Sequence, residues 1–291
     1  MASVVQALGI IGYPLGHSLS PLMHTVALRH LGLPYRYQAY EVEPGRLKGA
    51  LEGVRALGIR GVNVTIPHKQ AVLPYLDELS EEARLMGAVN TITREADGRL
   101  IGHNTDGVGF LTALREEGGL SGAGLRVAIL GAGGASRALA AKLLREGAGE
   151  LAILNRTPGR AAALAEELRA KFPGSTVAGA PLGGPEAAEA VAGADLLVNA
   201  TSAGLKGGAE GVIPVSPDLL RPGLVVCDIV YNPLMTPLLL AAKAHKARPI
   251  TGLGMFIHQG AESFRIWTGC EMPIGLVRRR LLRALRGGSR V

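Results

Sequence analysis

The chain has 291 residues, which by typical domain sizes is enough for about two domains, each with a core of its own. Hydrophobic residues make up 47% of the sequence and charged residues 19%, a balance typical of folded globular proteins rather than disordered ones. No apolar run approaches the roughly 20 residues of a membrane span, and the opening residues lack the cationic segment of a secretory signal. We therefore expect a cytoplasmic protein with no membrane partner.

Basic residues outnumber acidic residues by 31 to 24, which gives a net charge of +7. Six of these charges lie in an acid-free C-terminal tail, as Arg278, Arg279, Arg280, Arg283, Arg286 and Arg290. Subtracting these six from +7 leaves about +1 for the rest of the chain. A short basic tail is more typical of a solvated helix end than of a nucleic-acid surface, so we expect no nucleic-acid partner.

Cysteines and histidines do not show the spacing of a metal site. Cys227 and Cys270 lie far apart without a CxxC pattern, which favours buried or idle thiols over a disulfide framework. We expect satisfied or solvent-facing rings for the histidines near the motifs, which are His17, His24, His68, His103 and His258. The sequence thus predicts no metal, and Trp267, on an apolar helical stripe, is expected in the core.

The first hundred residues predict alternating strands and helices. Strand-length apolar runs occur at 7–11, 35–41 and 61–65. Between the first two, Ser20 and Pro21 indicate a helix that Ser20 caps and Gly32 ends. After the third, Pro67 indicates another helix start, with Lys69 in its first turn. Because the helix dipole disfavours a cation there, the position of Lys69 needs a reason.

A strand, a glycine-rich turn, a helix and a second strand follow one another between 125 and 155, as in a βαβ unit. The continuing alternation predicts a parallel sheet covered by helices on both faces. Further strands are expected at 194–199, 224–228 and 248–250. The stretch 178–193, rich in Ala, Gly and Pro, predicts a loop followed by a helix. Helical patterning resumes at 255–268 and 274–285.

These elements predict an α/β fold of two domains that face a cleft. The first, 1–105, is an α/β substrate domain, completed by C-terminal helices within 252–291 that pack back on it. The second, 106–251, is a Rossmann-like, doubly wound dinucleotide-binding domain.

The glycine-rich turn of the second domain reads Gly131, Ala132, Gly133, Gly134, Ala135 and Ser136. Gly131 permits a tight turn, Gly133 lets the backbone approach a pyrophosphate, and the helix start offers N–H groups to that anion. Ser136 replaces the third glycine and is small enough for the helix to approach the strand, with packing slightly wider than glycine allows. The alternative is a glycine-rich turn that binds no ligand.

The second strand of the βαβ unit ends in Asn155, Arg156 and Thr157, with Arg160 a turn later. An NAD enzyme usually presents an acid here, and a carboxylate would repel the 2′-phosphate of NADP. A guanidinium instead pairs with phosphate oxygens and can stack on adenine, so these residues favour NADP over NAD. In the alternative, Arg156 and Arg160 only solvate the start of a surface helix.

The segment NATSAG, 199–204, follows another predicted strand at the carboxyl edge of the sheet, where ligands of doubly wound sheets bind. We expect Thr201 and Gly204 to line the cofactor groove, although an ordinary polar turn has the same spacing.

Nine motifs occur in a consistent order along nearly the whole chain: GYPLGHSLSPLMH, VNVTIPHK, GAVNTI, GHNTDG, GAGGASRA, NRT, NATSAG, DIVYNP and TGLGMFIHQGAESF. Together they resemble the shikimate dehydrogenase family. The resemblance implies reversible reduction of 3-dehydroshikimate to shikimate with NADPH, a step of chorismate and aromatic amino acid biosynthesis. The arginine-rich tail after Leu285 matches no functional motif.

The resemblance also implies roles for single side chains. Ligands of the substrate carboxylate correspond to Ser18, Ser20 and Tyr231. Hydrogen-bond partners of the ring oxygens correspond to Thr65, Lys69, Asn90, Asp106 and Gln259. Cofactor contacts correspond to 131–136, 155–157 and Thr201, with Met255 near the nicotinamide. The same family pattern also allows another side chain to have the role of one of these ligands, namely Asn63, Asn104 or Thr105.

Within this set, the resemblance makes Lys69 and Asp106 the catalytic pair. Hydride delivery to a ketone builds negative charge on its oxygen, which the Lys69 ammonium could protonate while Asp106 holds a neighbouring hydroxyl and the lysine. Taken singly, Lys69 could be a solvated helix lysine, Asp106 an N-terminal cap, and Ser18 or Ser20 a turn residue.

Two other functions remain compatible with the sequence. One is a quinate/shikimate dehydrogenase of broader substrate range, or a relative acting on an aminated analogue. The other is a catalytically silent, NADP-sensing regulatory protein, against which the presence of both Lys69 and Asp106 argues. We expect a small-molecule substrate as the partner, and either a monomer or a homodimer.

Overall fold

The computed structural model describes residues 5–16, 18–207 and 209–286 of the chain. It consists of two compact units, Met1–Asp106 with Ile257–Val291, and Gly107–Phe256. The chain passes from one unit to the other within two helices, α5 (Asp106–Gly118) and α10 (Gly252–Thr268). His17 and Arg290, both named above, lie outside the described residues.

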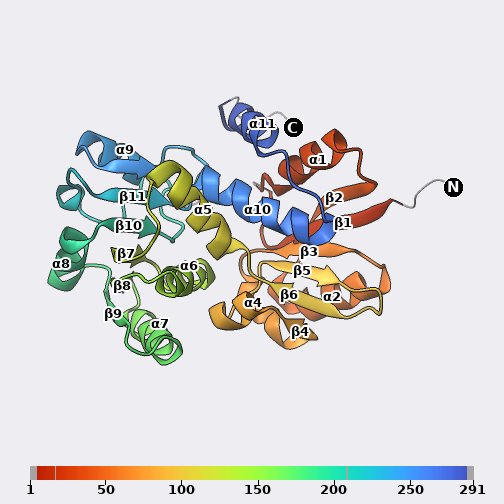
Figure 1. Cartoon of the computed structure of the whole chain (residues 1–291), viewed down its shortest axis with the longest axis horizontal. Helices are drawn as coiled ribbons and strands as arrows, with labels where there is room; N and C mark the ends of the chain where they lie inside the picture. Colours follow the sequence, from red (N-terminus) through yellow and green to blue (C-terminus); the bar gives the residue numbers. More distant parts are fainter. Residues whose placement is uncertain (1–4, 17, 208, 287–291) are drawn as a thin grey trace. The chain divides into compact units, whose positions relative to one another are not determined.

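The first unit is built on a six-stranded mixed sheet with the order β2-β1-β3-β5-β6-β4 (Figure 1). Its strands are β1 (Gln6–Gly12), β2 (Tyr35–Glu41), β3 (Gly61–Val64), β4 (Glu78–Leu79), β5 (Thr91–Arg94) and β6 (Leu100–His103). Its helices, besides parts of α5 and α10, are α1 (Ser20–His30), α2 (Leu47–Ala56), α3 (His68–Ala71), α4 (Glu81–Met86) and α11 (Ile274–Arg286). Buried Val, Leu and Ile side chains from the sheet and α2 form the core of this unit.

The three strands predicted in the first hundred residues are confirmed as β1, β2 and β3. The sequence pattern did not reveal β5 and β6, which pair antiparallel with each other, and β5 also pairs antiparallel with β3. Both have only four residues, too few for a clear alternation of polar and apolar positions.

The start of α1 differs from the prediction. Its N-cap is Leu19, and the Ser20 side chain makes no capping bond. The nearest equivalent is Ser18, whose Oγ accepts the backbone N–H of Ser20 at 3.3 Å. The end of the helix is as predicted, because Gly32 follows the last turn with a φ of +62° that favours glycine.

The C-terminal helices pack on the first unit, as predicted. Trp267 of α10 is fully buried and donates its indole N–H to the Ile92 carbonyl at 2.9 Å. Gly61 and Gly260 leave room for this packing, since a Cβ on either would collide with Trp267 or Met23. The arginine-rich α11 lies beside α1 (Figure 1).

The second unit contains a six-stranded, fully parallel sheet with the order β12-β11-β10-β7-β8-β9. Its strands are β7 (Arg126–Leu130), β8 (Glu150–Asn155), β9 (Thr176–Pro181), β10 (Leu196–Asn199), β11 (Val225–Asp228) and β12 (Arg248–Ile250). Its helices, besides parts of α5 and α10, are α6 (Gly134–Arg145), α7 (Pro158–Lys171), α8 (Pro185–Gly193) and α9 (Pro237–Ala244). The strand order reverses at β7, which confirms the predicted doubly wound fold.

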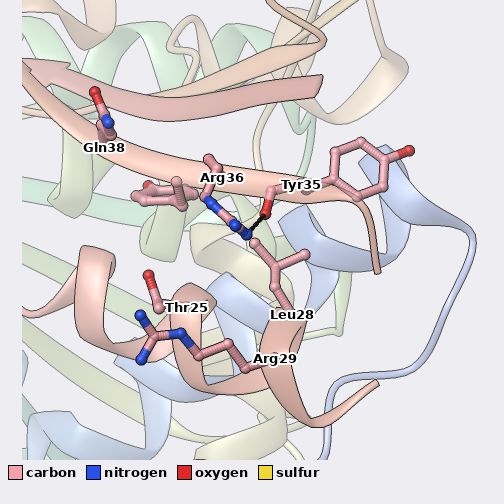
Figure 2. Close-up of a pocket in the computed structure, with 7 residues that line it drawn as sticks. Thr25, Leu28, Arg29, Tyr35, Arg36 and Gln38 are labelled. Carbon is pink, nitrogen blue, oxygen red and sulfur yellow. Dashed lines mark hydrogen bonds between the residues drawn. The ribbon is translucent and has the colours of Figure 1, made fainter. Parts of the chain in front are cut away.

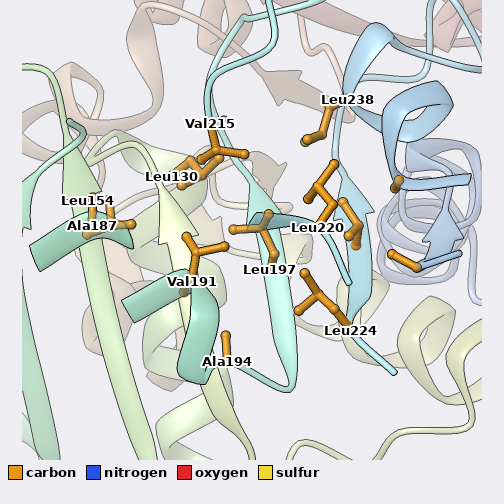
Figure 3. Packing of buried hydrophobic residues seen from close by; sticks show 14 of the residues in the cluster. Leu130, Leu154, Ala187, Val191, Ala194, Leu197, Val215, Leu220, Leu224 and Leu238 are labelled. Atoms are coloured by element: carbon orange, nitrogen blue, oxygen red, sulfur yellow. The ribbon is translucent and has the colours of Figure 1, made fainter. Parts of the chain in front are cut away.

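Apolar side chains of α8, α9 and the strands form a continuous core in this unit (Figure 3). The labelled Val191, Leu197 and Leu224 are buried side chains of this cluster. The expectation of a loop at the start of 178–193 was wrong, because β9 occupies 176–181. It is the edge strand of the sheet, and an edge tolerates Pro181 because fewer backbone bonds are needed there, while Gly179 leaves room for the backbone of α7, whose Ala161 carbonyl oxygen would lie 2.5 Å from a Cβ at this position.

Two further expectations concern membranes and thiols. Among the described residues, no helix combines the length and the apolar character needed to cross a bilayer. Cys227 is a buried free thiol, as expected, and burial raises its pKa well above the usual range. The thiol therefore stays protonated at neutral pH.

His24 departs from the expected satisfied or solvent-facing histidines. It is fully buried and stacks on Tyr37 with ring centroids 4.3 Å apart, and Trp267 lies at 5.4 Å. Neither of its ring nitrogens has a hydrogen-bond partner among the described residues. Burial lowers the pKa of His24 to about 3, and the nearby Asn63 only partly offsets this shift.

We predict that His24 makes the folded chain less stable below neutral pH. The unfolded chain protonates this ring below about pH 6.5, whereas the folded chain keeps it neutral to about pH 3. The free energy of unfolding therefore falls as the pH drops from 6.5 towards 3. Between pH 7 and pH 5, the free energy of unfolding measured with urea should fall by about 2 kcal/mol more for wild type than for the His24→Phe variant. His30→Gln, at an exposed position of the same helix, should respond like wild type. Equal losses for His24→Phe and wild type would contradict this account.

Candidate active site

Lys69 and Asp106 form a close ion pair in the first unit. The chain leaves β3 and turns at Pro67 into α3, which places Lys69 in the first turn as predicted. Asp106 is the first residue of α5, and its Oδ2 lies 2.6 Å from Lys69 Nζ. The two side chains are only 18% and 5% exposed. The carboxylate therefore supplies the reason for a lysine at this helix start.

The amide of Asn90 holds the carboxylate of this pair. Asn90 is buried, and its Nδ2 donates to Asp106 Oδ1 at 2.8 Å and to Thr105 Oγ1 at 2.9 Å. Its Oδ1 accepts from the backbone N–H of Thr105 at 2.8 Å and from the Thr91 hydroxyl at 3.0 Å. Both ends of the amide are thus engaged, which fixes the orientation of Asn90 and of the carboxylate.

Helix α10 contributes two side chains to the same group. Gln259 is half-buried, with its Oε1 3.4 Å from Asn90 Nδ2. One turn later, Ser263 is fully buried, with its Oγ 2.7 Å from the Thr91 hydroxyl and 3.1 Å from Asn63 Nδ2. Ser263 was not predicted from the sequence, where its only signal is its spacing of four residues from Gln259 on one helix face.

The three candidate replacement ligands face inwards. Asn63, Asn104 and Thr105 are at most 5% exposed. Asn63 accepts from the Tyr37 hydroxyl at 2.7 Å, and Asn104 bonds both the Ala88 carbonyl and the Asp106 N–H. Each of the three also bonds Asn90 or Asp106, so they belong to the same hydrogen-bonded group as the Lys69–Asp106 pair.

Ser18, Ser20 and Thr65 are not joined to the ion pair by hydrogen bonds within the described residues. Ser18 is half-buried and bonds the start of α1, where Ser20 is buried. Thr65 follows β3 and is tied by its backbone N–H to the Ile11 carbonyl at 2.9 Å. Their roles therefore rest on the motifs alone.

In the second unit, the glycine-rich turn follows β7 and opens α6, as predicted. Gly131 has a φ of +108°, and a Cβ there would lie 3.1 Å from both Ala200 O and Ser136 Oγ. A Cβ on Gly133 would meet nothing within 4 Å, and as the N-cap of α6 this residue brings no capping side chain. The turn thus has open space beside Gly133 and N–H groups at a helix start, which fits a pyrophosphate.

Ser136 is fully buried, and its hydroxyl has no hydrogen-bond partner among the described residues. A small side chain at this position therefore fits inside the second unit. The remaining residues of the turn, Ala132, Gly134 and Ala135, are half-buried.

The end of β8 carries the arginines expected to select the cofactor. Asn155 is half-buried and donates to the Thr157 carbonyl at 3.1 Å, while Thr157 is the N-cap of α7. Arg156 and Arg160 are exposed, and no acid occurs in 155–160. The segment therefore presents positive charge and no carboxylate at this edge of the sheet.

The other expected cofactor residues lie in the loop after β10 and at the start of α10, and Tyr231, expected to bind the substrate carboxylate, lies in the loop after β11. Thr201 bonds Asn199 through its hydroxyl at 2.7 Å, and Gly204 has a φ of +83°. Tyr231 stacks on Phe256 with centroids 4.2 Å apart, next to the buried Met255. All belong to the second unit.

A separate shallow cavity lies between α1 and β2 of the first unit (Figure 2). Its volume is about 180 Å³, and it is lined by Thr25, Leu28, Arg29, Tyr35, Arg36, Tyr37 and Gln38. None of the predicted site residues lines it. Across the described residues, no group of three or more His, Cys, Asp or Glu side chains is placed to hold a metal ion.

Three family models match the chain in order. They are described as the shikimate dehydrogenase substrate-binding domain, over 10–92, the shikimate/quinate 5-dehydrogenase model, over 114–206, and the shikimate 5′-dehydrogenase C-terminal domain, over 252–282. A Methanopyrus kandleri relative, named shikimate dehydrogenase (NADP(+)), is 48% identical over 97% of this chain and 96% of its own. The chain belongs to the shikimate dehydrogenase family.

Solved members of the family share its fold. A shikimate dehydrogenase in complex with NADP+ has a TM-score of 0.89 and 42% identity, with 97% of this chain and 96% of that chain covered. The Thermus thermophilus enzyme, solved with NADP(H) and shikimate, has a TM-score of 0.85 and 41% identity, with 96% and 100% covered.

We predict unequal stability effects for two alanine substitutions in the glycine-rich turn. Gly131→Ala should lower the free energy of unfolding by about 1–3 kcal/mol, because alanine is strained at this positive φ. Gly133→Ala should change it by less than about 0.5 kcal/mol, because its backbone is extended and its Cβ meets open space. Urea unfolding of both variants measures the difference. Equal destabilisation by the two would be inconsistent with this turn geometry.

Proposed function

We propose that this chain catalyses the reversible, NADP-dependent reduction of 3-dehydroshikimate to shikimate in aromatic amino acid biosynthesis. The observation that carries the proposal is the Lys69–Asp106 pair, 2.6 Å apart and held by the buried Asn90 amide. Relatives named shikimate dehydrogenase (NADP(+)) and a structure solved with NADP(H) and shikimate support the reaction and the cofactor. These two residues are the acid–base groups of the proposal.

The proposed cofactor site lies in the domain assigned to 106–251, with Met255 just beyond its C-terminal boundary. Bound NADPH supplies the hydride. The N–H groups at the start of α6 bind the pyrophosphate beside Gly133, and Arg156 and Arg160 bind the 2′-phosphate. Thr201, Gly204 and Met255 complete the proposed contacts, with those of 131–136 and 155–157.

Lys69 and Asp106 divide the acid–base work in this proposal. The Lys69 ammonium donates a proton to the carbonyl oxygen as negative charge develops on it, and takes one back in the reverse direction. Asp106 orients the ammonium and accepts a hydrogen bond from a neighbouring substrate hydroxyl. Because Asn90 engages Oδ1 while Lys69 engages Oδ2, the carboxylate keeps one orientation throughout.

The remaining substrate contacts follow the motifs. In our proposal, Ser18, Ser20 and Tyr231 bind the carboxylate, while Thr65, Asn90 and Gln259 bind ring oxygens. The substrate domain is 1–105 with 252–291. We further propose that the protein is cytoplasmic, acts as a monomer or homodimer and binds no nucleic acid.

A direct assay tests the proposal. The absorbance of the reduced cofactor, NADPH or NADH, is followed with shikimate or quinate and with NADP+ or NAD+, and we expect the highest kcat/KM for shikimate with NADP+. Higher kcat/KM for quinate would favour the broader activity, which the shikimate/quinate family model over 114–206 keeps open. If neither substrate is turned over, the result would instead favour the alternative of a catalytically silent, NADP-sensing regulatory protein.

Lys69→Ala should lower kcat by about 10²–10⁴-fold because it removes the proton donor, and should leave the KM for NADP+ nearly unchanged because Lys69 is not among the proposed cofactor contacts. Lys48→Ala is the matched control, because Lys48 is an exposed lysine of the same unit. Steady-state kinetics at saturating shikimate measure both variants. A Lys69→Ala variant with near-normal kcat would remove this residue from the mechanism.

Arg156→Ala should reduce the preference for NADP+ over NAD+, measured as the ratio of kcat/KM values, by about tenfold or more. The reason is loss of a guanidinium that pairs with the 2′-phosphate. Arg126→Ala, at the opposite end of β7 from the glycine-rich turn, should leave the ratio unchanged. If Arg156→Ala also left it unchanged, the arginine would have no phosphate role.

A further inference from the structure

Asp228 is a buried acid that the proposed mechanism does not use. It ends β11 and is fully buried, as are its neighbours Asn199 and Thr236. Burial raises its pKa to about 6, although three hydrogen bonds oppose the shift. Because it has no exposed surface, Asp228 has no access to a cofactor or substrate. A carboxylate kept at this cost needs a structural explanation.

The three hydrogen bonds lead to different parts of the second unit. Asp228 Oδ1 accepts from Asn199 Nδ2 and from the backbone N–H of Val230, each at 3.0 Å. Asp228 Oδ2 accepts from the Thr236 hydroxyl at 2.7 Å. Thr236 is the N-cap of α9, so this bond connects Asp228 to α9 and not to the loop 199–204.

The bond to Asn199 determines which way that amide faces. Since a carboxylate only accepts, Asn199 must turn its NH₂ group towards Asp228 and its Oδ1 away. That Oδ1 accepts from both the backbone N–H of Thr201, at 3.1 Å, and its hydroxyl, at 2.7 Å. A flipped amide would place its NH₂ group against the Thr201 N–H and its oxygen against the carboxylate. The Ala203 carbonyl accepts from the same NH₂ group at 3.3 Å, so Asp228, the nearer acceptor at 3.0 Å, and this carbonyl together favour the amide orientation that holds Thr201.

Thr201 in turn lies against the glycine-rich turn. A Cβ on Gly131 would be 3.1 Å from Thr201 Cγ2 and 3.1 Å from the Ala200 carbonyl oxygen. The Ala200 N–H also donates to the Leu130 carbonyl, directly before this turn, at 2.9 Å. Thr201 and Ala200 thus border the space beside Gly131, and a shift of their loop would change that space.

We infer that Asp228 is a positioning residue for NADP binding, which orients Asn199 and thereby holds the Thr201 loop against Gly131 without touching the cofactor. The inference rests on the proposed function for the identity of the ligand. It assigns the effect on NADP binding to the hydrogen bond between Asp228 and Asn199 and not to the one between Asp228 and Thr236. Substitutions can therefore separate the two hydrogen bonds.

The test measures the dissociation constant of NADP+ for the full-length chain by titration calorimetry, with no substrate present. Asp228→Ala and Asn199→Ala should each weaken binding by about tenfold, and the double variant should be no weaker than the weaker single one. Two independent sites would instead multiply to about a hundredfold. Multiplied effects, or binding like wild type in either single variant, would overturn the inference.

Thr236→Val is the matched control, since it removes a bond to the same carboxylate at an equally buried position. It should lower the melting temperature but keep the dissociation constant within about twofold of wild type. Asp228→Asn, which retains an acceptor for Asn199, should bind within about threefold of wild type. If Asp228→Ala does not fold, Asn199→Ala and Thr236→Val carry the test. Weakening by Thr236→Val equal to that by Asn199→Ala would show a general stability effect and contradict the inference.

The failure of this inference can be told from failure of the proposed function. If wild type does not bind NADP+, the proposed cofactor is wrong, and Asp228 positions nothing for it. If wild type binds NADP+ and turns over shikimate while the Asn199→Ala variant binds equally well, only the positioning role is wrong.

Discussion

The ion pair between Lys69 and Asp106 is the interaction on which the proposed chemistry depends. A lysine that is mostly shielded from water keeps its charge at low cost only beside an opposite charge with good geometry. The second carboxylate oxygen is taken by Asn90, whose own oxygen is held by Thr91 and Thr105. The position of the ammonium is therefore set by buried hydrogen bonds rather than by the exposed surface.

Local sequence signals predicted much of this arrangement because their physics is local. Pro67 placed Lys69 in a first helical turn, where the unfavourable dipole pointed to a partner. The strand, glycine turn and helix around Gly131 were recognisable because each needs a particular residue type at a particular position. The preference for NADP was likewise predicted from side-chain chemistry alone, because no acid occurs in 155–160.

Long-range packing could not be predicted in the same way. Ser263 meets Asn63 across 200 positions, and Asn199 meets Asp228 across 29, so neither bond has a sequence pattern. His24 was expected to be satisfied or exposed, because only the assembled fold shows its stack on Tyr37. The edge strand β9 was missed for a related reason, since whether Pro181 is tolerated depends on which strand lies at the sheet edge.

The most direct test of the central claim is a crystal structure of the chain with NADP+ and shikimate bound. Our account predicts that Lys69 Nζ lies within about 3.2 Å of the hydroxyl on the carbon to be oxidised, with Asp106 on the same or the adjacent hydroxyl. A complex in which Lys69 and Asp106 contact only each other, while another side chain holds that hydroxyl, would contradict it.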